Sequence, residues 1–156
     1  MDEDTRRFLI ACAETAATHW VEKDQGIWEV RGDPQHFIYS KVMCWVALDR
    51  AIAIADELGA SDRVDQWKQQ RDEIWTTVVR DGWSDEAGAF TQYTGSTGLD
   101  ASNLMMAIVG FLPADDPRWR RTLDVVRREL KSGNHLFRYV AADDFGAPSR
   151  RIPPDP

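Results

Sequence analysis

Helical periodicity of two alternating kinds is the feature that most restricts the fold of this 156-residue chain. Residues 64–78 and 119–130 carry apolar side chains at steps of three and four, with charged residues between them, which is typical of a helix with one buried stripe. Residues 8–20 show the same pattern more weakly. Residues 42–55 and 104–112 are apolar on nearly every side, which predicts helices buried all round.

The order along the chain therefore alternates between amphipathic and buried helices. Stacked helical hairpins with an inner and an outer layer produce this alternation, whereas an ordinary bundle would make every helix amphipathic. We expect an all-α chain, part of an α/α toroid, with about five helices that are inner and outer in turn. Asp116–Pro117 predicts the start of the last helix, and Gly133 predicts its end.

Three short aromatic segments occupy the same position, between an outer helix and the next inner element. They are residues 26–31, 88–93 and 135–140, and in each of them apolar and polar residues nearly alternate, which predicts a short extended strand. Equivalent connections of a toroid lie on one rim. The side chains predicted to meet around one opening there are those of Glu29, Gln92 and Arg138.

Glu29 is the candidate of greatest chemical interest because it stands between Trp28 and Val30. Desolvation by these neighbours would raise the pKa of its carboxyl group, and a protonated glutamic acid can serve as a general acid. Arg31 would oppose that effect, because alternate residues of a strand share a face. A surface pair of Glu29 and Arg31, with Trp28 packed inward, is the simpler alternative, and spacing alone favours it.

The other charged residues also have structural explanations. Asp100 is better explained as a helix cap than as a catalytic base. Asp49 and Arg50 interrupt an apolar run, so we interpret them as a buried structural pair. Lys41 begins an inner helix near the rim, where it could contact substrate or reach water. His36 is better explained as a loop residue that forms hydrogen bonds than as a group that carries a proton in catalysis.

Charge and cysteine content restrict the partners and the compartment. The net charge of −7 argues against nucleic acid or an anionic membrane as the main partner. The longest apolar run, residues 42–48, is far shorter than the ~20 residues of a membrane span. The acidic start lacks the charge order of a signal peptide, and we interpret Cys12 and Cys44 as buried thiols, so we expect a cytoplasmic protein. The three histidines are scattered, and we expect no metal and no cofactor.

Long runs of this sequence resemble glycoside hydrolase family 15, which contains glucoamylases, glucodextranases and bacterial trehalases. The runs are GIWEVRGDPQHFIYSKVMCWVALDRAIAIADELG, GWSDEAGAFTQYTGSTGLDASNLMMAIVGFLPADDPR and LFRYVAADDFGAP, in the order of the bacterial members. The resemblance implies part of an (α/α)6 barrel whose active site lies at one rim. It also implies inverting hydrolysis of α-glucosidic bonds by a general acid and a general base.

The resemblance assigns roles to individual residues. Glu29 of the Trp28–Glu29 motif looks like the general acid, and Arg138–Tyr139 looks like the motif that contacts the sugar. Val30 stands where some relatives carry a second acidic residue. The complete set of predicted substrate contacts is Trp28, Arg31, His36, Lys41, Arg138 and Tyr139.

Part of the family pattern is missing from the sequence. The family's general base lies in a downstream motif that this chain does not contain, although inversion requires a second carboxylate ~6.5–9.5 Å from the acid. Asp100, Asp143 and Asp144 are the acidic alternatives, and none matches the motif. We therefore expect residues 1–148 to be a partial catalytic domain, truncated on both sides. Residues 149–156 form a Pro-rich tail unlike the family, for which a shifted reading frame is one explanation.

Three functions remain open from the sequence. The first is an α-glucosidic hydrolase fragment acting on a disaccharide or oligosaccharide, either trehalose or an α-glucan, and inactive without the base. The second is an inactive helical scaffold whose exposed apolar faces lead to self-association or require a partner chain. The third is another sugar-active α/α barrel such as an epimerase, which would use histidines for proton transfer.

Overall fold

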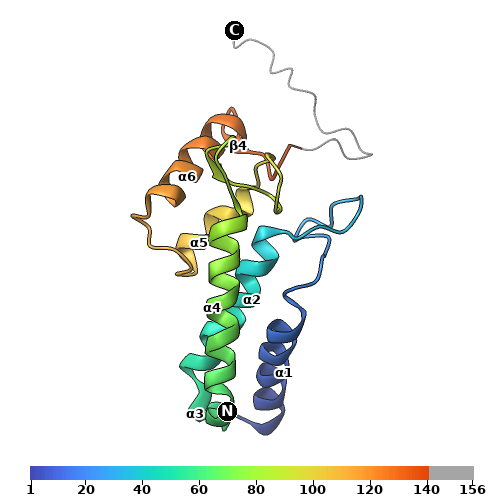
Figure 1. Ribbon diagram of the computed structural model, residues 1–156, viewed down its shortest axis with the longest axis vertical. Helices are drawn as coiled ribbons and strands as arrows, with labels where there is room; N and C mark the ends of the chain where they lie inside the picture. The colour runs from blue at the N-terminus through green and yellow to red at the C-terminus, as the bar shows by residue number, and fades with distance from the viewer. Residues whose placement is uncertain (141–156) are drawn as a thin grey trace.

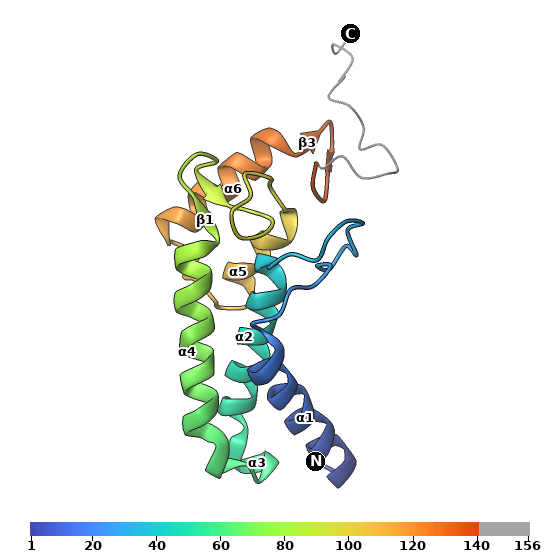
Figure 2. The same cartoon turned by 45° about the vertical axis from the view of Figure 1, so that its right-hand side comes forward.

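The computed structural model describes residues 1–140 of the chain. Three long helices, α1 (Glu3–His19), α2 (Ile38–Ala53) and α4 (Val64–Asp81), form an elongated body, and α2 packs against both of the others (Figures 1 and 2). Shorter elements lie at both ends of this body (Figures 1 and 2). At one end, α3 (Ala55–Leu58) and η1 (Ser61–Arg63) connect α2 to α4. The other end carries η2 (Ala101–Leu104), α5 (Met105–Ile108) and α6 (Pro117–Glu129).

Two antiparallel hairpins complete the fold. One pairs β1 (Trp83–Ser84) with β2 (Ala89–Phe90), and the other pairs β3 (Lys131–Ser132) with β4 (His135–Leu136). The second and third aromatic segments therefore contain short strands, as the alternation predicts. Gly133 adopts φ +56 in the turn of the second hairpin. The prediction that Gly133 ends the last helix is wrong, because α6 already ends at Glu129 and glycine serves the hairpin turn instead.

The core lies between α2 and α4. Trp67, Ile74 and Val78, spaced as the periodicity predicts, are almost fully buried on α4. They belong to the same apolar cluster as the buried stripe of α2. Trp45 on α2 packs edge-on against Phe111 with ring centroids 5.2 Å apart, and this contact joins the body to the segment after α5.

The two segments predicted to be buried all round are only partly buried. Met43 on α2 is 37% exposed, and Ile108 on α5 is 75% exposed. Residues 104–112 also form no single helix, because η2 and a one-turn α5 are followed by Gly110 at φ +80. An apolar pattern indicates that a side chain favours burial, but no residue among 1–140 covers the exposed sides of Met43 and Ile108.

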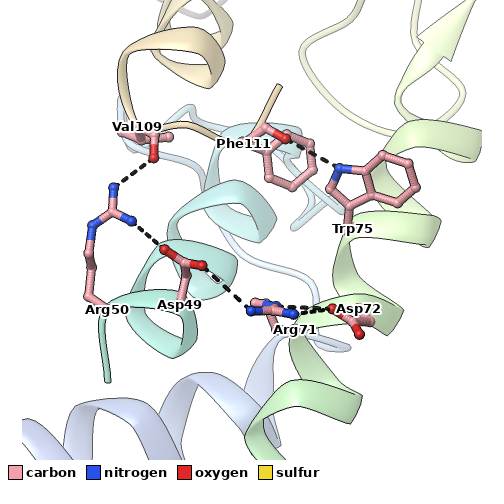
Figure 3. Close-up of polar contacts among 7 residues, drawn as sticks. All are labelled: Asp49, Arg50, Arg71, Asp72, Trp75, Val109 and Phe111. Atoms are coloured by element: carbon pink, nitrogen blue, oxygen red, sulfur yellow. Dashed lines mark hydrogen bonds and ion pairs between the residues drawn. The ribbon is translucent and has the colours of Figure 1, made fainter. Parts of the chain in front are cut away.

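Asp49 and Arg50 form an ion pair as predicted, but the pair lies at the surface rather than in the core. Arg50 is exposed and the Asp49 side chain is 25% exposed. Arg50 also donates to the Val109 carbonyl at 2.7 Å, and Arg71 on α4 lies 3.7 Å from the other Asp49 oxygen (Figure 3). The network joins α2, α4 and the turn after α5, and its exposure limits each pair to about 0–1 kcal/mol.

The environment of the cysteines differs from the prediction. Cys12 is exposed, so its expected burial is wrong; Cys44 is half-buried, and this burial raises the pKa of its thiol. Among residues 1–140, no helix has the length and apolar character needed to cross a membrane. The cytoplasmic location stays a prediction.

Candidate active site at the rim

Residues 24–35, which we call the Glu29 loop, project beside the start of α2 (Figures 1 and 2). Asp24 and Gln35 close the base of the loop through two backbone hydrogen bonds of 2.9 Å. Within the loop, the N–H of Val30 donates to the Gln25 carbonyl at 2.9 Å. The loop is therefore a hydrogen-bonded unit rather than a loose connection.

Glu29 ends a tight turn in this loop. Its N–H donates to the Gly26 carbonyl at 3.2 Å, and its φ of +48 is left-handed. No other non-glycine residue among those described has a positive φ, a conformation that is costly and concentrates at functional sites. The extended strand predicted for residues 26–31 is thus wrong. Enclosure by Trp28 and Val30 is wrong as well, because the turn leaves the Glu29 side chain exposed.

Trp28 connects the first and third aromatic segments. Its indole N–H donates to Oδ1 of Asp100 at 3.0 Å, and the Arg138 guanidinium lies 5.2 Å from the centroid of its ring, a cation–π distance. Asp100 and Tyr139 pair as an isolated β-bridge, and the Ala101 N–H donates to the Arg138 carbonyl at 2.8 Å. The Trp–Glu and Arg–Tyr motifs, far apart in the sequence, therefore meet through Trp28, whereas the predicted meeting of the Glu29 and Arg138 side chains stays a prediction.

Asp100 is the centre of this cluster and is only 2% exposed. Its Oδ1 accepts the Ser102 N–H at 2.8 Å and the Ser102 hydroxyl at 2.6 Å, which confirms the predicted cap at the start of η2. The same oxygen accepts the indole N–H of Trp28. Three donors around a buried oxygen make Asp100 a poor base for activating water. The bond to Trp28 was missed, because no local spacing signals a partner 72 positions away.

Gln92 lies at the start of α2, next to the Glu29 loop. It is 5% exposed; its carbonyl accepts the Ile38 N–H at 3.0 Å, and its own N–H donates to the Gly98 carbonyl at 2.8 Å. Its amide nitrogen has no hydrogen-bond partner among the described residues. Gln92 thus anchors the start of α2, and its side chain forms no hydrogen bond to Glu29 or Arg138 in this part of the chain.

Lys41 fastens the base of the Glu29 loop onto α2. Its ammonium group donates to the Glu22 carbonyl and lies 3.8 Å from the Asp24 carboxylate, and the residue is 6% exposed. Burial lowers the pKa of Lys41, and the negative charge of Asp24 opposes this effect. Asp24 in turn accepts the Ser40 hydroxyl at 2.7 Å and the Gly26 N–H at 2.5 Å. The Lys41 ammonium is thus occupied inside the protein, and its contact with substrate stays a prediction.

The remaining predicted site residues lie on the Glu29 loop, next to it, or outside the described part. Arg31 is exposed on the loop. His36 is half-buried just after it, and its carbonyl accepts the Thr94 N–H at 3.1 Å. Asp143, Asp144 and the Pro-rich tail of residues 149–156 lie outside the described residues.

Comparison with known proteins gives one consistent family. The sequence model described as glycosyl hydrolases family 15 matches residues 12–141. A trehalase of Mycobacterium tuberculosis is 48% identical over 126 residues, which are 81% of this chain and 18% of that protein. A trehalase of Thermoplasma acidophilum is 42% identical over 125 residues, covering 80% of this chain and 22% of that protein.

Solved structures extend the likeness to the fold. A wild-type glycosidase superposes with a TM-score of 0.69 at 19% identity, covering 79% of this chain and 32% of that one. A variant of a glycosidase solved with glucose gives 0.68 at the same identity and coverage. The chain spans about a fifth of the length of the curated relatives it matches. Its helices form part of an (α/α)6 barrel, and the chain belongs to glycosyl hydrolase family 15.

Proposed function

We propose that this chain contributes the general-acid side of an enzyme that hydrolyses α-glucosidic bonds, with trehalose as its first candidate substrate. The observation that carries the proposal is the meeting of the Trp28–Glu29 and Arg138–Tyr139 pairs through Asp100. The name trehalase, shared by relatives 41–48% identical to this chain, favours trehalose over α-glucans.

In this mechanism Glu29 donates its proton to the glycosidic oxygen as the bond from that oxygen to the anomeric carbon breaks. The released glucose leaves as a neutral alcohol. A water molecule attacks the anomeric carbon from the opposite face, and a second carboxylate accepts its proton, so the configuration inverts. Arg138 and the Trp28 ring hold the sugar beside Glu29.

We assign the second carboxylate to the part of the relatives' length that this chain does not match. Asp100 is unsuited because three donors surround its Oδ1 and the residue is buried. The chain by itself is therefore expected to be inactive, although it carries the acid.

A chimaera tests this proposal. Residues 12–141 replace the matched segment of the Mycobacterium tuberculosis trehalase, and glucose release is measured from trehalose, maltose and isomaltose. We expect cleavage of trehalose above the other two sugars. Glu29→Gln should lower kcat by about 10²–10⁴-fold, the usual contribution of a general acid.

The matched control is Glu73→Gln, which changes an exposed glutamate on α4 and should leave the rate unaltered. A rate unaffected by Glu29→Gln would remove Glu29 from its role. Glucose released by the 156-residue chain alone would overturn the assignment of the base to another part of the protein.

A further inference from the structure

We propose that Asp100 is a positioning residue: through Trp28 it sets the Glu29 turn at a fixed place beside the Arg138–Tyr139 pair. The inference rests on the proposed role of Glu29 as the acid. Asp100 itself touches no substrate in this proposal and acts through the indole ring.

The first argument is that capping alone does not require a buried charge. η2 is a four-residue turn, and a neutral asparagine caps helix starts about as well as aspartate. Burying a carboxylate is costly unless strong donors surround it. The bond from the Trp28 indole to Oδ1 is charge-assisted, and bonds of this kind are about twice as strong as neutral ones. The charge of Asp100 thus has a use beyond η2, and that use is to hold Trp28.

The second argument is the position of Trp28 in the Glu29 loop. The base of the loop is closed by the Asp24–Gln35 bridge, but its tip is open, with Ile27 46% exposed and Glu29 exposed. Trp28 lies between these two residues, and Asp100 holds the edge of its ring while Arg138 covers a face. Because Glu29 follows directly in the chain, fixing Trp28 fixes the backbone from which the acid extends.

The third argument is that the same short segment also holds the sugar-contact pair. The backbone of Asp100 bridges Tyr139, and the next residue, Ala101, donates to the Arg138 carbonyl. The side chain of Asp100 therefore binds one half of the site while its backbone binds the other. Asp100 thus connects the two halves of the site directly. If Asp100 were only a helix cap, the surrounding loops alone would set the distance between the two halves.

Nuclear magnetic resonance of the 156-residue chain tests the contact directly. Trp28→Phe assigns the indole N–H signal of Trp28 by its disappearance. Asp100→Ala should shift this signal and speed its exchange with solvent, and Asp100→Asn, which keeps an acceptor oxygen but loses the charge, should restore the protection only in part. Asp116→Ala removes the cap of α6 without touching Trp28, so its Trp28 signal should not change. An unshifted Trp28 signal in Asp100→Ala would overturn the inference.

Kinetics of the chimaera test the consequence. Asp100→Ala should lower kcat by about 10–100-fold, since small misplacements of a reacting group cost up to about 10²-fold. Trp28→Phe removes the same hydrogen bond, so the double variant should be no slower than the slower single variant. Asp100→Asn, which keeps the acceptor but not the charge, should recover only part of the rate, and Asp116→Ala should keep the full rate. Multiplying losses in the double variant would mean that Asp100 does not act through Trp28.

The two proposals fail in different ways. If Glu29→Gln leaves the chimaera active, the proposed acid is wrong even where the indole signal responds to Asp100. If Glu29→Gln inactivates the chimaera and Asp100→Ala leaves kcat unchanged, only the positioning role is wrong.

Discussion

At the scale of single residues, the Glu29 turn depends on a glycine that meets two constraints at once. Gly26 adopts φ +68, and a Cβ atom there would lie 2.8 Å from Cδ1 of the Phe37 ring. Phe37 is 4% exposed and packs edge-on against Tyr93 with ring centroids 5.6 Å apart, so it has little room to move. The turn that presents Glu29 thus requires both left-handed backbone and an absent side chain.

Gly26→Ala should lower the free energy of unfolding by roughly 2–4 kcal/mol, the sum of about 1 kcal/mol for the left-handed backbone and 1–3 for overpacking. Gly59→Ala is the matched control. Gly59 has a φ of +69 with open space around the Cβ position, so only the backbone cost of about 1 kcal/mol is expected. Urea denaturation of both variants measures the difference. Equal decreases in the free energy of unfolding would show that the Phe37 ring moves aside without cost.

Lys41 should make the free energy of unfolding depend on pH in the alkaline range. Its folded pKa is lowered from 10.5, so between the two pKa values the unfolded state binds more protons than the native state. The free energy of unfolding therefore rises with pH across that window. Below the folded pKa the buried charge is present in full and the contribution is constant. In Lys41→Met this rise should be absent.

Urea unfolding from about pH 7 to 10.5 measures the wild-type minus Lys41→Met difference. Both chains carry Cys44→Ala, because the raised pKa of this thiol acts in the opposite sense and interacts with Lys41. Asp24 and Glu22, the other charged neighbours of Lys41, are the same in both. A difference that stays constant across this range would contradict the lowered pKa.

Sequence reasoning found the two rim motifs and the cap at Asp100, because each has a local signature. The left-handed Glu29 and the buried Lys41 had none. Glu29 takes its conformation from Gly26 and the closure of the loop, and Lys41 takes its burial from Asp24 and Glu22. The backbone pairing that holds Gln92 at the start of α2 had no local signature either, and the meeting of its side chain with those of Glu29 and Arg138 stays a prediction.

At the scale of elements, α6 docks onto the β1–β2 hairpin through one buried hydroxyl. Thr122 is fully buried; its Oγ1 donates to the Arg118 carbonyl at 2.8 Å and accepts the Phe90 N–H at 3.0 Å. The second bond crosses from a helix to a strand and satisfies a buried backbone donor. The amphipathic stripe predicts that α6 packs against something, but this hydroxyl fixes where.

Thr122→Val should lower the free energy of unfolding by about 1–3 kcal/mol, because valine keeps the shape and leaves the Phe90 N–H without an acceptor. Thr76→Val is the control, since Thr76 on α4 makes the same bond to a carbonyl four residues back, Asp72 at 2.8 Å, but is exposed. It should change stability by less than about 0.5 kcal/mol. Thermal or urea denaturation compares the two variants. Similar decreases in stability would show that the Thr122 hydroxyl does not hold α6 on the hairpin.

The outer helices were predictable because a polar face and an apolar stripe together define both the helix and its orientation. The second inner segment was not, because its apolar residues only predict burial and carry no sign of where the helix breaks. Gly110 was the available signal, and its left-handed φ ends the segment's helical course.

At the scale of the whole molecule, the described chain presents apolar surface that a closed barrel would cover. A groove of about 690 Å³ runs between α1 and α2, and Phe8, Met43 and Cys44 lie along it. Phe8 is 66% exposed, and Ile108 on α5 is 75% exposed. The chain matches only 32% of a superposed glycosidase, so a large part of that fold is available to cover such surfaces in the relative.

From these surfaces we propose that the 156-residue chain self-associates in a concentration-dependent way. Phe8→Ser combined with Ile108→Ser should shift its mass toward that of the monomer, because both side chains are exposed and lose contact area only in an assembly. Gln66→Ser with Gln69→Ser, two exposed polar positions on α4, is the matched control and should leave association unchanged. Light scattering coupled to size-exclusion chromatography measures the mass. A wild-type chain that stays monomeric at roughly 100 μM would show that these apolar faces are too small or too divided to drive association. The alternative of an inactive helical scaffold would then lose its main support.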